Sequence, residues 1–89
     1  MKQENLITLV FIVNGVEYPI EKVNVNQPLS VSVTKALKDS GNTGRDLNDW
    51  QVKWNDDTLD INNKVVFYNL PDGAQLFLSL KAGVGGNGK

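Results

Sequence analysis

The sequence predicts a small α+β domain in which one helix packs on one face of a β-sheet. Three features predict it: an Asn-Gly pair between two apolar stretches, one helical pattern after them, and two stretches of alternating residues further on. With 89 residues, the chain fits one domain and is too short for two. The expected elements are, in order, a hairpin, a helix, a strand, a short return strand and a last strand.

The first element expected is an antiparallel hairpin. Residues 6–13 are rich in β-branched and aromatic side chains, which indicates a strand with both faces at least partly covered. Asn14-Gly15 follows at once and is the strongest short hairpin signal, because a type I′ turn requires a positive φ at both central residues. Residues 16–25 alternate loosely. Pro19 predicts that this second strand lies at an edge, since proline cannot donate a ladder hydrogen bond.

A helix is expected to begin at Pro28. Proline suits the first helical turn, where its missing N–H is not needed. The apolar residues after it have the spacing of one helix face, and they are Leu29, Val33, Ala36 and Leu37. Gly41 and Asn42 supply a C-terminal stop. One short helix with an apolar face must pack on a partner, and the sheet of the hairpin is available.

A half-buried strand is expected next, after a polar loop over residues 42–48. Trp50, Val52 and Trp54 alternate with Gln51 and Lys53, which is the period of a strand with one covered face. The two tryptophans share that face, so we expect them to pack in the core rather than to form a binding platform. Tyr18 and Tyr68 are expected to be packing residues as well.

The last strand is expected after two turns. A turn over residues 55–57 leads into a short return strand over residues 58–61, and residues 65–68 are apolar but too few to assign. Asp-Gly ends a second turn over residues 70–73. After it, Leu76, Leu78 and Leu80 alternate with other side chains in the final strand.

The composition excludes several classes of function. The chain contains no cysteine and no histidine, so disulfides, thiolate metal sites, cysteine nucleophiles and histidine bases are all absent. No recognisable catalytic pair remains among the other side chains, so we expect neither enzyme activity nor a cofactor. The net charge is −1 and the charges are scattered, which argues against nucleic acid and membrane partners. The first apolar run is too short to span a membrane and lacks a signal-peptide cleavage site, so we expect a cytoplasmic protein.

The end of the chain resembles ubiquitin-like proteins. Leu78-Ser79-Leu80 leads through residues 81–84 into Gly85-Gly86, as alternating leucines lead into a glycine pair in that family. Residues 70–73 match the family's turn into its last strand, and residues 52–59 match its third strand and following turn. The resemblance implies a β-grasp fold with a mixed sheet of four to five strands on one helix. It assigns residues 1–82 to the domain and residues 83–89 to a flexible tail.

The resemblance is strongest to the divergent bacterial ubiquitin-like modifiers. It implies a protein modifier that is cut after Gly86 by a JAB-type peptidase, then activated and joined through that glycine to amines of target proteins. Partners of the activating-enzyme and conjugating-enzyme kinds are implied too. Gly85 would give clearance in their narrow channels because it lacks a side chain. Lys81 and Val84 would be recognised beside it.

Three departures from the family are visible. Lys81 is the only cation before the glycine pair, where the family usually has arginines. The outward positions of the third strand are Gln51 and Lys53 instead of an apolar patch, so ubiquitin's usual receptors are not expected to bind there. Residues 87–89 follow the glycine pair, as in a precursor. Two other functions stay open: an interaction domain that is not conjugated, and a sulfur carrier.

Two further patterns are given simple interpretations. Residues 83–88 fit the G-x-G-x-x-G spacing, and residues 83–89 fit that of a P-loop, but both motifs need a helix directly after the loop to hold the phosphate. We therefore expect no nucleotide site. Asp56, Asp57 and Asp60 lack the spacing and the glutamate of a calcium loop, so a solvated turn is expected.

Overall fold

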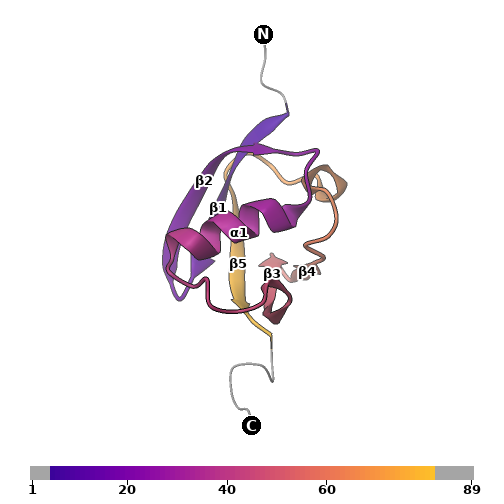
Figure 1. Ribbon diagram of the computed structural model, residues 1–89. Coiled ribbons are helices and arrows are strands. Elements are labelled where there is room, and N and C mark those ends of the chain that lie inside the picture. Colours follow the sequence, from indigo (N-terminus) through magenta and orange to yellow (C-terminus); the bar gives the residue numbers. More distant parts are fainter. Residues whose placement is uncertain (1–4, 82–89) are drawn as a thin grey trace.

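The computed structural model describes residues 5–81 of the chain. Five strands form one mixed sheet in the order β2-β1-β5-β3-β4, in which β1 and β5 are parallel and the other neighbours are antiparallel. The helix α1 crosses one face of this sheet (Figure 1). The elements are β1 Leu6–Val13, β2 Val16–Asn24, α1 Leu29–Asp39, the 3₁₀-helix η1 Leu47–Asp49, β3 Trp50–Trp54, β4 Asp57–Leu59, the 3₁₀-helix η2 Val65–Tyr68 and β5 Ala74–Leu80.

The N-terminal hairpin is confirmed. Asn14 and Gly15 connect β1 to β2 with φ of 54° and 82°, the positive values that their turn type requires. Strand β2 is an edge strand, as Pro19 predicts. The pairing shifts between Ile7 and Leu9, where Lys22 adopts a φ of 58° and β2 carries one residue more than β1. This β-bulge interrupts the outer edge of the sheet.

The helix is confirmed, but Pro28 precedes it instead of lying in its first turn. Pro28 is extended, with a ψ of 147°, and forms an isolated bridge with Lys64. The first helical N–H groups are bound by a later loop: Leu29 N–H donates to Asn63 O at 2.9 Å and Ser30 N–H donates to Ile61 O at 2.8 Å. Long-range contacts therefore place the start of the helix one residue later than local proline geometry suggests.

The C-terminal end of α1 is a Schellman motif, as the Gly41-Asn42 pair predicts. Gly41 has a φ of 79°, and its N–H donates to Lys38 O at 3.1 Å. Asn42 N–H donates to Leu37 O at 2.7 Å. These two bonds satisfy carbonyl groups that the end of a helix would otherwise leave unpaired.

Strand β3 occupies the residues predicted, but the return strand ends early. It covers Asp57–Leu59 rather than residues 58–61. The reason is Tyr68: its hydroxyl accepts a hydrogen bond from Asp60 N–H at 2.7 Å and donates to Asp60 O at 3.0 Å. The Asn63 side chain also donates to this hydroxyl, at 3.0 Å. Because the backbone of Asp60 is bonded to a side chain, it cannot continue the ladder.

Two short 3₁₀-helices lie between the strands. The apolar run over residues 65–68 forms η2. The predicted polar loop over residues 42–48 ends earlier than expected, because η1 begins at Leu47. The side chain of Asp46 accepts a hydrogen bond from Asn48 N–H at 3.0 Å and so caps η1.

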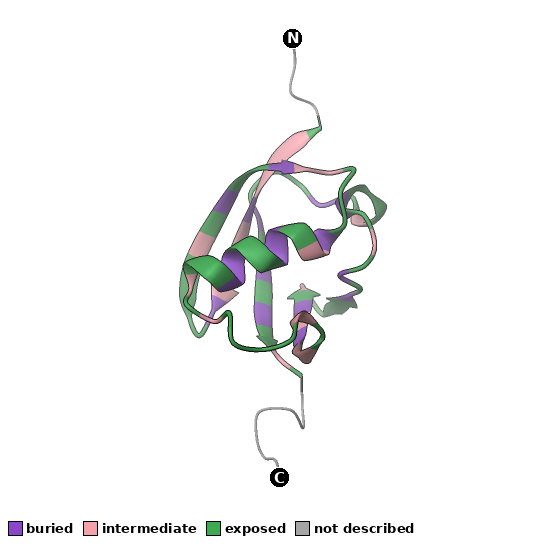
Figure 2. Cartoon of the chain, viewed as in Figure 1, coloured by how far each residue is buried: buried purple, intermediate pink, exposed green. Residues whose placement is uncertain are grey.

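The core lies between the sheet and α1 (Figure 2). The predicted helix face is buried, and the leucines at alternating positions of β5 point into the same layer. The four largest fully buried side chains come from β1, α1 and β5, and they are Phe11, Leu9, Leu29 and Leu76. Trp50 is buried, whereas Trp54, Tyr18 and Tyr68 are partly buried and pack against the core, which confirms that all four are packing residues.

Candidate functional site: the end of β5 and the outer face of the sheet

The central strand β5 delivers the chain to the end of the sheet at Leu80. Lys81 follows; it is exposed, and its N–H donates to Asp49 O at 2.9 Å. This bond holds the departing chain against η1, directly before β3. Of the predicted site residues, Lys81 is therefore placed beside η1. Val84, Gly85 and Gly86 lie outside the described residues, as does the proposed tail over residues 83–89.

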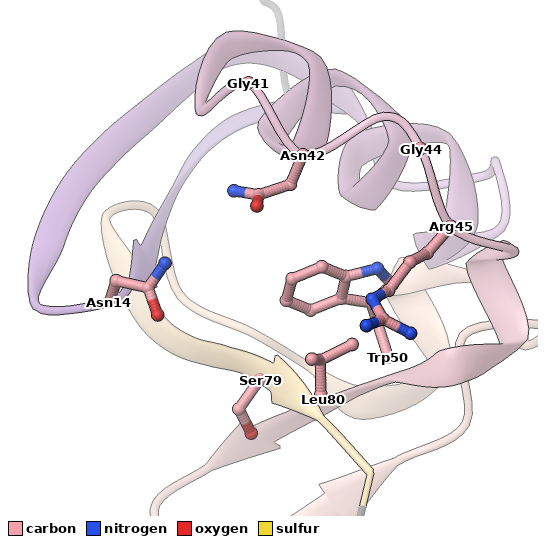
Figure 3. A pocket seen from close by; sticks show the side chains of 8 residues that line it. All are labelled: Asn14, Gly41, Asn42, Gly44, Arg45, Trp50, Ser79 and Leu80. Atoms are coloured by element: carbon pink, nitrogen blue, oxygen red, sulfur yellow. The ribbon is translucent and has the colours of Figure 1, made fainter. Parts of the chain in front are cut away.

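A hollow of about 700 Å³ lies beside Leu80, and Figure 3 shows its lining. The indole of Trp50 lies near its centre, with the Asn42 amide and the Arg45 side chain on the loop that covers it. Only 6% of Trp50 is exposed, and its indole nitrogen Nε1 has no hydrogen-bond partner among the residues that the structure describes. The lining residues are Asn14, Gly41, Asn42, Gly44, Arg45, Trp50, Ser79 and Leu80.

Arg45 is a residue that sequence reasoning missed. The sequence places it far from the C-terminal residues, where Lys81 is the only cation near the glycine pair. In the fold, Trp50 pairs with Leu80, and this pairing brings the loop before β3 next to the end of β5. Arg45 and Leu80 consequently line the same hollow. Only the pairing of β3 with β5 shows that Arg45 lies near the end of β5.

The face of the sheet opposite α1 carries a second feature. Lys53 is exposed and Gln51 is half-buried on this face, as their alternation with buried residues predicts. Phe77 on β5 is 53% exposed between them and β1. It pairs with Ile12 on one side and Lys53 on the other. The apolar centre of this face is therefore on β1 and β5, not on the third strand.

Acidic residues give no metal site in the described part of the chain. Within residues 5–81, no group of three or more acidic, histidine or cysteine side chains could hold a metal ion. Asp56 and Asp57 are exposed at the β3–β4 turn, and the Asp60 side chain accepts a hydrogen bond from Asn62 N–H at 2.9 Å. No helix of this part is long and apolar enough to cross a membrane.

Comparison with known proteins places the chain in a family. Residues 2–86 match a family described as proteins of unknown function, DUF2604. The chain belongs to this DUF2604 family. An uncharacterized protein of Sinorhizobium fredii, y4jI, is 40% identical over 81 residues, which is 90% of this chain. The chain spans 62% of the length of that relative.

Solved structures show that this DUF2604 protein has the ubiquitin-like β-grasp fold. A de novo designed protein based on ubiquitin superimposes with a TM-score of 0.75 at 15% identity, over 93% of this chain and 98% of its own. A structure titled as molecular mimicry of SUMO that promotes DNA repair gives 0.73 at 17% identity, over 85% and 92%. The ubiquitin of Caldiarchaeum subterraneum gives 0.70 at 15% identity, over 91% and 99%. The predicted fold class is confirmed.

Proposed function

We propose that this protein is a ubiquitin-like modifier that is joined to target amines through Gly86. In this proposal the chain is the substrate of activating and conjugating enzymes and is not an enzyme itself. A JAB-type peptidase removes residues 87–89, and the cytoplasm supplies ATP and reduced thiols.

The observation that carries the proposal is the connection between the fold and the glycine pair. The β-grasp domain ends in a central strand, and the N–H of the next residue, Lys81, is hydrogen-bonded to Asp49 O. Gly85-Gly86 follows a few residues later in the sequence. The family match includes both glycines and ends at Gly86. A rigid domain followed by a glycine pair is the form that a modifier needs to present its terminal carboxylate to several enzymes in turn.

The chemistry assigns a role to each residue near the end. The Gly86 carboxylate attacks the α-phosphorus of ATP and releases pyrophosphate, and a cysteine thiol of the activating enzyme then displaces AMP to form a thioester. A target amine finally displaces the thiol. Gly85 leaves room for a narrow channel. Lys81 and Val84 are contacts for the enzymes, and Arg45 adds a cation beside the strand end that the sequence around the glycines lacks.

The proposal is tested by intact mass and by adduct formation. The chain is incubated with a JAB-type peptidase from its own genome, and loss of residues 87–89 is the expected result. Tagged chain is then expressed in its native host. Gly86→Ala should abolish adducts, whereas the matched variant Gly88→Ala should leave them unchanged, because that residue is removed first. Adducts that persist in Gly86→Ala would contradict the proposal.

The same experiment separates the two alternatives. A sulfur carrier would show Gly86 with sulfur in place of one carboxylate oxygen and would form no protein adducts. An interaction domain would keep its mass, with the peptidase shown to be active on another substrate. The exposed Phe77 favours an interaction role in addition to conjugation.

A further inference from the structure

The outer face of the sheet carries one row of side chains with an unusual order of charge. Cross-strand pairing places Glu17 opposite Ile12, Ile12 opposite Phe77, and Phe77 opposite Lys53. Residues paired in this way point to the same face of a sheet. The row therefore reads acid, apolar, apolar, base across β2, β1, β5 and β3. Glu17 and Lys53 are exposed, and Ile12 is half-buried.

The centre of this row exposes apolar surface. Phe77 is 53% exposed although it lies on the middle strand of five. Ile12 lies beside it, and Val10, two residues before Ile12 on the same face, is half-buried too. A large exposed aromatic side chain in the middle of a sheet face, with opposite charges at its rim, has the composition of a protein contact surface.

We propose that this face binds a second copy of the chain. A two-fold axis parallel to the strands, midway between β1 and β5, makes β1 of one copy face β5 of the other and β2 face β3. Ile12 then packs on Phe77 of the partner copy, and Glu17 meets Lys53. Two aligned sheets pack about 10 Å apart, which long acidic and basic side chains span from both sides. The row is complementary to itself in this arrangement.

The charges select this arrangement over its alternative. A two-fold axis along the row would place Glu17 on Glu17 and Lys53 on Lys53, and like charges in contact repel. Within one copy the two charges are three strand spacings apart, about 14 Å. This separation exceeds the Debye length of about 8–10 Å at ordinary salt concentrations, so their attraction is largely screened. Glu17 and Lys53 therefore gain little from each other in one copy and gain contact in the dimer.

The outer edge of β2 is a poor site for pairing with another strand. Pro19 and the bulge at Lys22 interrupt the outer hydrogen-bonding edge of β2. Both features disfavour strand addition by another chain, and β4, at the other edge of the sheet, is only three residues long. Self-association is therefore assigned to the face and not to the edge. It does not depend on the conjugation proposed above, since no tail residue takes part.

Sedimentation equilibrium of the full chain tests the proposal. Because each copy contributes one exposed aromatic side chain, we expect weak association, with a dissociation constant of roughly 0.1–1 mM, and the measurement should extend to about 2 mM protein. Phe77→Thr, which keeps a good strand residue, should leave a monomer. Phe67→Thr is the matched control: Phe67 is 68% exposed but lies on η2, which is not part of the sheet, and its loss should leave the dimer unchanged.

Charge reversal gives the sharper test. Glu17→Lys and Lys53→Glu should each raise the dissociation constant about tenfold or more, since each places like charges in contact twice per dimer. The double variant restores opposite pairs and should dimerise like the original chain. Circular dichroism confirms that each variant is folded. A chain that is monomeric throughout, a dimer that survives Phe77→Thr, or a double variant that fails to recover would each overturn the proposal.

Discussion

The hydroxyl of Tyr68 offers a single-atom test of how the second half of the chain is held. It makes three hydrogen bonds, two to the backbone of Asp60 and one to the side chain of Asn63. Tyr68→Phe removes all three and leaves the ring in place. Each bond contributes about 0.5–1.5 kcal/mol net, and the exposed position of Asp60 lets water replace part of that. We expect a loss of about 2 kcal/mol in the free energy of unfolding.

Two measurements check this expectation. Urea denaturation gives the free energy of unfolding, and the melting temperature should fall by about 8–16 °C for a domain of this size. Hydrogen exchange should also become faster at the Asp60 amide, which loses its acceptor. Both readouts follow directly from the three bonds.

Tyr18→Phe is the matched control for Tyr68→Phe. Tyr18 is partly buried against the core, but the described residues provide no hydrogen bond to its hydroxyl. Its variant should stay within about 0.5 kcal/mol of the original chain. Equal losses in the two variants, or a Tyr68→Phe protein as stable as the original, would refute the reasoning.

Two further predictions concern turns. Gly41→Ala should lose about 1 kcal/mol in chemical denaturation because a Cβ at φ 79° is strained although no atom lies within 4 Å of it. Gly44→Ala, equally open but without a positive φ, should be neutral or slightly stabilising, and equal effects at both glycines would contradict this. Asp72→Ala should cost about 1 kcal/mol by the same assay, because Asp72 Oδ1 accepts a hydrogen bond from Thr8 N–H at 2.7 Å and ties the last turn to β1. Asp56→Ala, at an exposed turn, serves as its control, and a loss as large there would count against the assignment.

The sequence contained the local determinants of the fold. Asn14-Gly15 determines its own turn, and the alternation around Val52 determines which residues of β3 are buried. Gly41 and Asn42 end the helix through bonds to residues three and five positions before them, respectively. Each of these depends on neighbours within one element or one turn, so a pattern of residue types is enough to predict it.

Features that depend on distant partners could not be predicted in the same way. The return strand is shortened by a tyrosine eight residues later, and Pro28 lies outside the helix because the loop over residues 61–63 binds the first helical N–H groups. Arg45 reaches the end of β5 only because β3 pairs with that strand. The exposed apolar surface at Phe77 could not be predicted either. The alternating leucines around it show which face of β5 is buried, but not which side chains of neighbouring strands lie together on the other face.

The position of β5 has a consequence for the time at which the protein becomes folded. This strand is the last of the five that the structure describes, yet it separates β1 from β3 in the sheet. Until β5 has been synthesised, no strand connects the β1–β2 hairpin and its helix to the β3–β4 pair. The parallel pairing of β1 with β5 joins residues more than sixty positions apart, and such distant contacts slow folding. A newly made chain therefore completes its core only after residues 74–80 have emerged, and before then the inner edge of β1 is open to other proteins.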